Sequence, residues 1–134
     1  MKTKHSLEAS DVKAILAAAE AEARANGWAV TIAVVDDGAH LLGLLRLDGA
    51  SASTAQMAPA KATTSVLGRR ESKVYEDLVL GGHITMLSAP GMQAMLEGGV
   101  PIIVDGDIVG AVGVSGVKSD QDVQIARAGI AAIL

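Results

Sequence analysis

Apolar residues along this chain recur with two different spacings, which divide it into helical and extended segments. Between Ser6 and Asn26-Gly27 they recur every three or four positions, as on the buried face of a helix. Ser6 is the type of residue that caps a helix start, and Asn26-Gly27 is the type of pair that ends one. The same spacing after Ser119 or Asp120 predicts a last helix that runs to the end of the sequence.

Two stretches of aliphatic residues are each interrupted by an Asp-Gly turn. Residues 29–35 and 40–47 flank Asp36-Asp37-Gly38, and residues 100–104 and 108–114 flank Asp105-Gly106-Asp107. This arrangement predicts two β-hairpins, because Gly accepts the positive φ of a tight turn. The paired strands are expected to be antiparallel, since parallel neighbours need a much longer connection. The glycines are too widely spaced for a phosphate-binding loop.

The middle of the chain is less regular. Residues 50–67 are predicted to be helical, with a kink or a broken start at Pro59. Ser72 is expected to cap a short helix over residues 73–80 that Gly81-Gly82 ends. Residues 83–96 are predicted to form a loop with a short strand near residues 92–96. The order of elements indicates one α+β domain over residues 1–134, in which helices cover an antiparallel sheet.

Composition and charge exclude several classes of function. The chain has 11 basic and 15 acidic residues, no basic run and only two aromatic residues, Trp28 and Tyr75, so we expect no nucleic-acid partner. No apolar run reaches membrane-spanning length, and there is no cysteine, so we expect a cytoplasmic protein without a membrane partner. Half of the residues are hydrophobic in a small domain, which predicts a homo-oligomer, a dimer or larger.

Four segments, in this order, carry a resemblance to a known family: AVVDDGAHLLGLLRLDGAS, AKATTS, GGVPIIVDGDIVGAVGVSG and DQDVQIARAGIAAI. They resemble the GlcG/HbpS family, also called the haem-degrading or DUF336 family, to which the C-terminal domain of PduO-type cobalamin adenosyltransferases is related. The resemblance implies an antiparallel sheet of about five strands flanked by helices, in dimers or larger homo-oligomers. It also makes haem a possible cofactor, because some members bind haem and others are associated with iron or corrinoid chemistry. Many members lie beside genes of small-acid catabolism.

The family-like motifs LLRLDGA and AKATTS contain the cations Arg46 and Lys61. With the backbone N–H groups of Gly98 and Gly99, these two side chains would suit a carboxylate, either of a small acid or of a haem propionate. This predicts a ligand pocket between the sheet and the helix that carries Lys61. In the alternative interpretation, Arg46 pairs with Asp48 and Lys61 lies over apolar surface without any ligand.

His83 and Asp48 are the candidate proton carriers. His83 follows Gly81-Gly82 and precedes Met86 and Met92, which makes it the first choice for a haem ligand or a general acid and base. The alternative is an ordinary loop histidine, because no second histidine lies at a ligand spacing. For the same reason, we expect no metal site built from protein ligands alone.

Two functions compete, the first on these residues and the second on what the resemblance implies. The first is an enzyme that acts on a small carboxylate by proton transfer, an isomerase, hydratase or lyase in a catabolic pathway. The second is a haem- or tetrapyrrole-binding protein without catalysis. The residues slightly favour the enzyme, because the chain has few aromatic side chains that could contact a haem and no cysteine that could bind its iron. A structural partner protein without a small ligand is a third interpretation.

Overall fold

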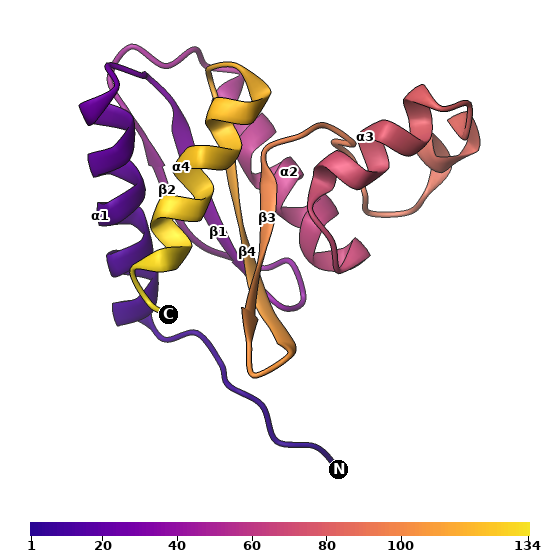
Figure 1. Ribbon diagram of the computed structural model, residues 1–134, viewed down its shortest axis with the longest axis horizontal. Coiled ribbons are helices and arrows are strands. Elements are labelled where there is room, and N and C mark those ends of the chain that lie inside the picture. The colour runs from indigo at the N-terminus through magenta and orange to yellow at the C-terminus, as the bar shows by residue number, and fades with distance from the viewer.

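The computed structural model describes residues 1–134 and has one antiparallel sheet at its centre (Figure 1). The strands lie in the order β2-β1-β4-β3. Their bounds are β1 Thr31–Asp36, β2 Leu41–Arg46, β3 Gly99–Val104 and β4 Asp107–Ser115. The predicted hairpins are confirmed, since β1 pairs with β2 and β3 pairs with β4, both antiparallel. The β1–β4 pairing, also antiparallel, joins the two hairpins.

The sheet has four strands, not the five that the resemblance implied. The short strand predicted near residues 92–96 is absent. In this segment the backbone N–H of Ala94 donates to the side chain of Thr64 at 3.3 Å, so this donor serves a helix contact and no sheet ladder. The α+β class with helices against an antiparallel sheet is confirmed.

The helices cover the two faces of the sheet unequally. Helices α1 (Ala9–Ala25) and α4 (Ser119–Ala131) lie side by side on one face, and α2 (Thr54–Gly68) lies on the other (Figure 1). Between the sheet and helices α1 and α4 lies a core of 17 buried hydrophobic residues. We call the sheet with α1, α2 and α4 the body.

Very small residues allow α2 to approach the sheet closely. A Cβ atom added to Gly99 would overlap the carbonyl oxygen of Lys61, and one added to Gly113 would overlap that of Ala58. Gly99 and Gly113 are paired across β3 and β4, so two residues without side chains lie next to each other in the sheet, directly beneath the α2 backbone. At these two glycines there is almost no room between helix and sheet, while a smaller cluster of buried side chains, which includes Val35, Val66 and Ile108, fills the rest of the α2 face.

Residues 72–96 leave the body and return to it as a projecting arm (Figure 1). The arm contains α3 (Ser72–Leu80) and the short 3₁₀-helix η1 (Ile84–Ser88). Both ends of the arm are joined by one hydroxyl. Ser72 Oγ donates to the Leu96 carbonyl at 2.5 Å and accepts from the Gly99 N–H at 2.8 Å.

The helix ends differ slightly from those expected. Helix α1 starts at Ala9 with Glu8 as its cap instead of Ser6, because Glu8 N–H bonds to Asp11 Oδ2 at 2.8 Å in a reciprocal capping arrangement. Helix α2 starts at Thr54, after a turn, and continues through Pro59. The predicted ends of α3 are correct to within about one residue, the usual uncertainty of helix termini. Helix α4 starts close to the predicted position but ends at Ala131, three residues before the predicted end.

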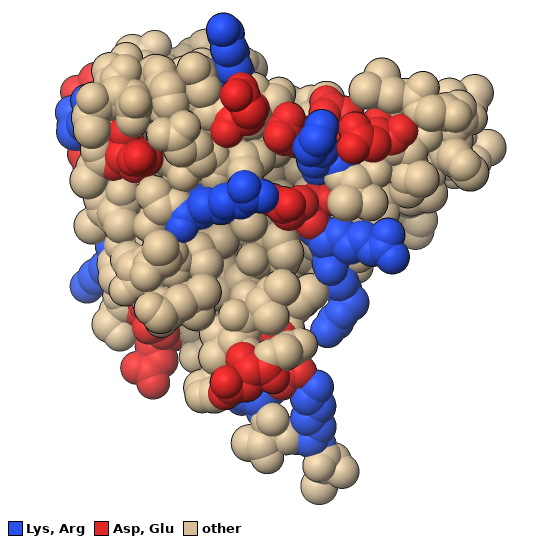
Figure 2. All heavy atoms as spheres, in the orientation of Figure 1, with Lys and Arg blue, Asp and Glu red and all other residues tan.

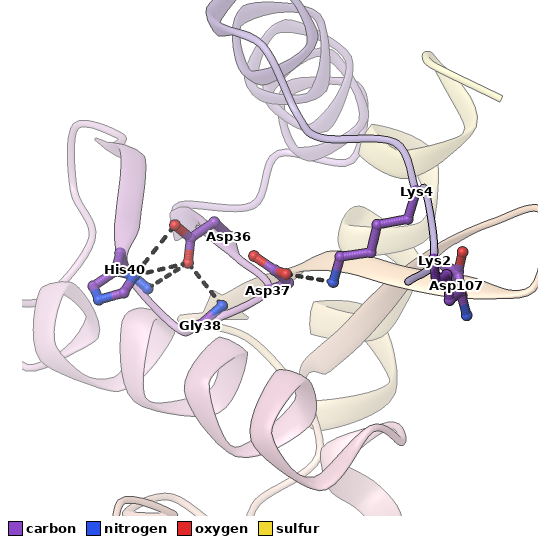
Figure 3. A network of polar contacts seen from close by, with 7 residues as sticks. All are labelled: Lys2, Lys4, Asp36, Asp37, Gly38, His40 and Asp107. Atoms are coloured by element: carbon purple, nitrogen blue, oxygen red, sulfur yellow. Dashed lines mark hydrogen bonds and ion pairs between the residues drawn. The ribbon is translucent and has the colours of Figure 1, made fainter.

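The N-terminal segment, residues 1–7, crosses both hairpin turns at one end of the sheet (Figure 3). Lys4 pairs with Asp37 of the first turn, and Lys2 pairs with Asp107 of the second. Asp36 binds its own turn by accepting from the N–H groups of Gly38 and His40 at 2.9 Å. Separately, none of the helices combines the length and apolar character needed to cross a bilayer.

Candidate functional site

Lys61 and Asp122 form a buried ion pair at the end of β4. Lys61 Nζ lies 3.0 Å from Asp122 Oδ2 and donates to the Val114 carbonyl at 3.1 Å. The other carboxylate oxygen of Asp122 accepts from the Val117 N–H at 3.3 Å. The two side chains are only 5% and 2% exposed. The pair therefore links α2 on one face of the sheet to the first turn of α4 on the other.

Burial raises the pKa of Asp122, and the neighbouring Lys61 ammonium opposes that rise. The dominance of burial has a simple physical cause: removing a carboxylate from water disfavours its charged form more than one partner restores. Glu97 adds a smaller effect in the same direction as burial. Asp122 thus takes up a proton more readily than an ordinary exposed aspartate, because its pKa is raised.

Lys61 lies against both glycines that the sequence placed near it. A Cβ atom at Gly98 would lie 2.7 Å from Lys61 Cδ and 2.8 Å from Nζ, and φ at Gly98 is +137°. Gly98 therefore provides the space through which the Lys61 side chain passes. The N–H of Gly99 is already used, because it donates to Ser72 Oγ.

Arg46 and Asp48 lie elsewhere. The Arg46 guanidinium donates twice to the Ala50 carbonyl, at 3.0 and 2.8 Å, and so holds the chain that follows β2. It makes no ion pair with Asp48, and the alternative interpretation of these residues is wrong on that point. Asp48 is exposed and lines a separate hollow beside Trp28.

The pocket expected between the sheet and the Lys61 helix is absent. None of the four surface hollows is lined by Arg46, Lys61, Gly98 or Gly99. The close approach of α2 to Gly99 and Gly113 explains this, since helix backbone fills the space that a ligand would need. Lys61 lies against the two glycines, but its ammonium group is paired with Asp122.

The most apolar hollow lies between the arm and Met57 of α2 and measures about 380 Å³. Seven of its nine lining residues are hydrophobic: Met57, Val79, Leu80, Leu87, Ala94, Met95 and Leu96, with Glu76 and Gln93 as the polar members. Residues 78–96 contain no charged side chain, and Figure 2 shows the outer end of the arm as a surface without Lys, Arg, Asp or Glu. This surface suits a large apolar ligand or a protein partner.

His83 belongs to this arm. It is exposed and precedes η1, between Leu80 and Leu87 of the hollow in the sequence, and its N–H donates to the Leu78 carbonyl at 2.9 Å. The other two histidines pair with turn aspartates, His5 with Asp105 and His40 with Asp36. The structure contains no cluster of three or more metal-ligating side chains.

Two features of these sites were missed from the sequence. The role of Asp122 was missed because nothing local in the sequence connects it with a lysine that lies 61 residues earlier. The arm hollow was missed because its methionines, Met57 and Met95, come from segments that were interpreted separately. The run of uncharged residues from 78 to 96 was the available signal.

The comparisons with known proteins agree on one family. The model of the family described as "Haem degrading protein HbpS-like" matches residues 7–131. Protein GlcG of Escherichia coli (strain K12) is 50% identical over 115 residues, which are 86% of this chain and 85% of that protein. An uncharacterised 15.0 kDa protein of Citrobacter freundii, from the dhaT-dhaS intergenic region, is 33% identical over 82% of this chain and 80% of its own.

Solved structures show the same fold. A double mutant of HbpS from Streptomyces reticuli superimposes with a TM-score of 0.89 at 32% identity, covering all of this chain and 91% of that one. A PduOC:Heme complex superimposes with a TM-score of 0.89 at 27% identity and covers 96% of both chains. Sequence and fold together show that this chain belongs to the HbpS-like family.

Proposed function

We propose that this protein binds haem or a related tetrapyrrole on the arm. The observation that carries the proposal is the apolar hollow, in which hydrophobic side chains and two thioethers surround a space of about 380 Å³. The likeness to a chain solved as a haem complex supports it. The alternative function that we derived from the sequence, tetrapyrrole binding without catalysis, is thereby preferred to the enzyme.

The residues of the arm fit one side of a haem. Leu80, Leu87 and the methionines would contact the apolar ring, and His83, Met57 or Met95 would supply an axial ligand. Arg69 and Arg70 at the base of the arm are exposed and make no ion pair with the protein, so they are free to pair with propionates. When bound, haem would supply an iron centre for ligand or electron chemistry.

Absorbance titration tests the proposal. Haem added to the purified protein is expected to give a saturable shift of the Soret band, and His83→Ala is expected to change its position through loss of the axial nitrogen. His40→Ala is the matched control, because His40 is an exposed histidine on the body. Equal effects of both substitutions would contradict His83 as a ligand, and no saturable shift would contradict haem binding.

A small-carboxylate enzyme remains the second candidate. It is favoured by the convergence of Lys61 with Gly98 and Gly99 beside Asp122, whose raised pKa suits it to carry a proton. The Lys61–Asp122 pair would have to open to admit the acid. Proton-transfer chemistry on a catabolic acid, with Asp48 or His83 as the proton carrier, stays a prediction.

Small acids of two to four carbons, followed by amide NMR shifts, test this candidate. If a carboxylate binds beside Lys61, Lys61→Ala is expected to weaken its binding by about 1.5–3 kcal/mol, the range for a charge-assisted hydrogen bond. Lys73→Ala is the control, since Lys73 is an exposed cation far along the sequence on α3. Unchanged affinity after Lys61→Ala would remove Lys61 from the site.

We also propose that copies of the chain associate through exposed apolar side chains, as the composition predicted. Leu80, Ile84 and Leu87 of the arm are 79%, 66% and 64% exposed, which is unusual for such residues unless a partner covers them. Light scattering is expected to give at least twice the chain mass. A mass of 13.5 kDa at micromolar concentration would contradict association.

A further inference from the structure

A second hollow lies on the body, at the end of α1, and it shares no residue with the hollow of the arm. It measures about 260 Å³ and is lined by Arg24, Gly27, Trp28, Ala29, Leu47 and Asp48. Trp28 is the sole tryptophan of the chain and is half-buried against the core. The chain has only two aromatic residues, and one of them lines this hollow, so an aromatic ring is available there to contact a ligand.

The carboxylate in this hollow has no partner within the protein. Asp48 is exposed and takes part in none of the ion pairs. The one cation of the hollow, Arg24, is already offset, because its Nε donates to Glu20 Oε2 at 2.7 Å on the same helix. With Glu20 counted together with Arg24, the charge around the hollow is that of the Asp48 carboxylate.

The end of α1 contributes in the same direction. This helix of 17 residues ends at Ala25, directly before the hollow-lining Gly27 and Trp28. The carbonyl groups at a helix C-terminus carry partial negative charge, which favours a cation nearby. The face of an indole ring attracts cations as well, through its quadrupole. Carboxylate, helix end and indole all favour the same kind of ligand.

We infer that this hollow binds a small organic ammonium ion, such as a quaternary or primary amine. The ammonium group would lie between the Asp48 carboxylate and the Trp28 ring, and its apolar substituents would contact Leu47 and Ala29. The volume of the hollow suits a molecule of that size, while a hydrated inorganic cation gains little from an aromatic wall. The site is independent of tetrapyrrole binding on the arm.

The fluorescence of Trp28 reports on the site directly, since no other tryptophan contributes. Choline is expected to change this fluorescence saturably, with a Kd on the order of millimolar or weaker, since the contacts with Trp28, Asp48 and the apolar wall are each modest. The neutral isostere 3,3-dimethylbutanol is expected to bind at least about tenfold more weakly at the same ionic strength. Equal responses to both molecules, or no saturable response to choline, would overturn the inference.

Two substitutions separate a site from a general charge effect. Asp48→Asn is expected to weaken choline binding by about fivefold or more, while Asp120→Asn, at an exposed aspartate on α4, leaves it unchanged. Trp28→Leu keeps apolar bulk but removes the ring, and amide NMR shifts of Gly27 and Gly49 then follow binding. Unchanged affinity in either Asp48→Asn or Trp28→Leu, or equal weakening in Asp120→Asn, would overturn the inference.

Discussion

The body and the arm differ in how far they bury their apolar side chains. In the body, Ala33, Ala62 and Ala111 are completely buried, and glycines bring α2 against the sheet. In the arm, the large side chains of Leu80, Ile84 and Leu87 are mostly exposed. The difference indicates that packing holds the body together, whereas the apolar surface of the arm is available for contacts with other molecules.

The largest effect is expected at the ion pair of the body. Asp122→Ala should lower the free energy of unfolding by about 3–5 kcal/mol, because it leaves the buried Lys61 ammonium without its anion. Glu71→Ala, which breaks the exposed pair with Arg127, should cost less than about 1 kcal/mol. Urea denaturation measures both. Similar losses in the two variants would show that burial does not distinguish the pairs.

The same ion pair predicts how stability depends on pH once Lys61 is replaced. In Lys61→Met, the Asp122 carboxyl stays buried and loses the cation that opposed the rise of its pKa. A group whose pKa is raised on folding binds its proton more tightly in the folded state, so its contribution to stability is lost as pH rises. Denaturation of this variant at pH 4.5 and pH 7.5 is expected to show greater stability at the lower pH, relative to the parent chain. A parallel pH profile in both proteins would contradict this.

The next effect concerns the close contact of α2 with the sheet. Gly113→Ala should cost about 2–3 kcal/mol, because the added methyl group meets helix backbone that cannot move aside alone. Gly106→Ala is the comparison, since its φ is +81° but no atom lies within 4 Å of the added Cβ, and it should cost about 1 kcal/mol. Thermal unfolding distinguishes the two. A smaller loss for Gly113→Ala would mean that α2 can shift away from the sheet.

The sequence predicted the body better than the arm for a physical reason. Each hairpin is encoded locally, by an Asp-Gly turn between aliphatic runs, so β1 to β4 could be placed without knowing any distant contact. Residues 83–96 lack such a local code. Their conformation depends on contacts with α2, such as that of Ala94 with Thr64, and the expected strand therefore did not form.

The candidate site shows the same limit. The family-like motifs correctly brought Lys61 together with Gly98 and Gly99, but no motif indicated that the ammonium would be neutralised by Asp122. A pairing across the end of a sheet depends on how α2 and α4 are oriented, which spacing along the chain does not encode. Arg46 was assigned to the same pocket because both cations lie in family-like motifs, and it bonds instead to Ala50.

A smaller effect is expected in the arm. Leu80→Ser should change the free energy of unfolding by less than about 1 kcal/mol, since the side chain is mostly exposed before the substitution. The same substitution should weaken haem binding or self-association, where an apolar surface is needed. Val66→Ser, at a buried position of α2, is the comparison and should destabilise the body severely. A large loss of stability in Leu80→Ser would show that the arm is packed like the body.

The smallest effect concerns the N-terminal segment. Its Lys4 lowers the pKa of Asp37, so the pair persists below the usual value of 3.8 and is lost as pH falls through the lowered pKa. Lys4→Ala should return the NMR titration of Asp37 toward 3.8 and change stability by less than about 1 kcal/mol. An unchanged titration would show that Lys4 does not hold the turn.

The double hydrogen bond of Ser72 has a topological consequence. Because one hydroxyl joins the residue that opens the arm to Leu96 and Gly99 at its close, the excursion begins and ends at a single point of the body. The entropy of closing such a loop grows only slowly with its length. The mostly exposed outer residues, 80–88, can thus be lengthened, shortened or exchanged at little cost to the sheet, which makes this position a natural place for the fold to vary its binding surface.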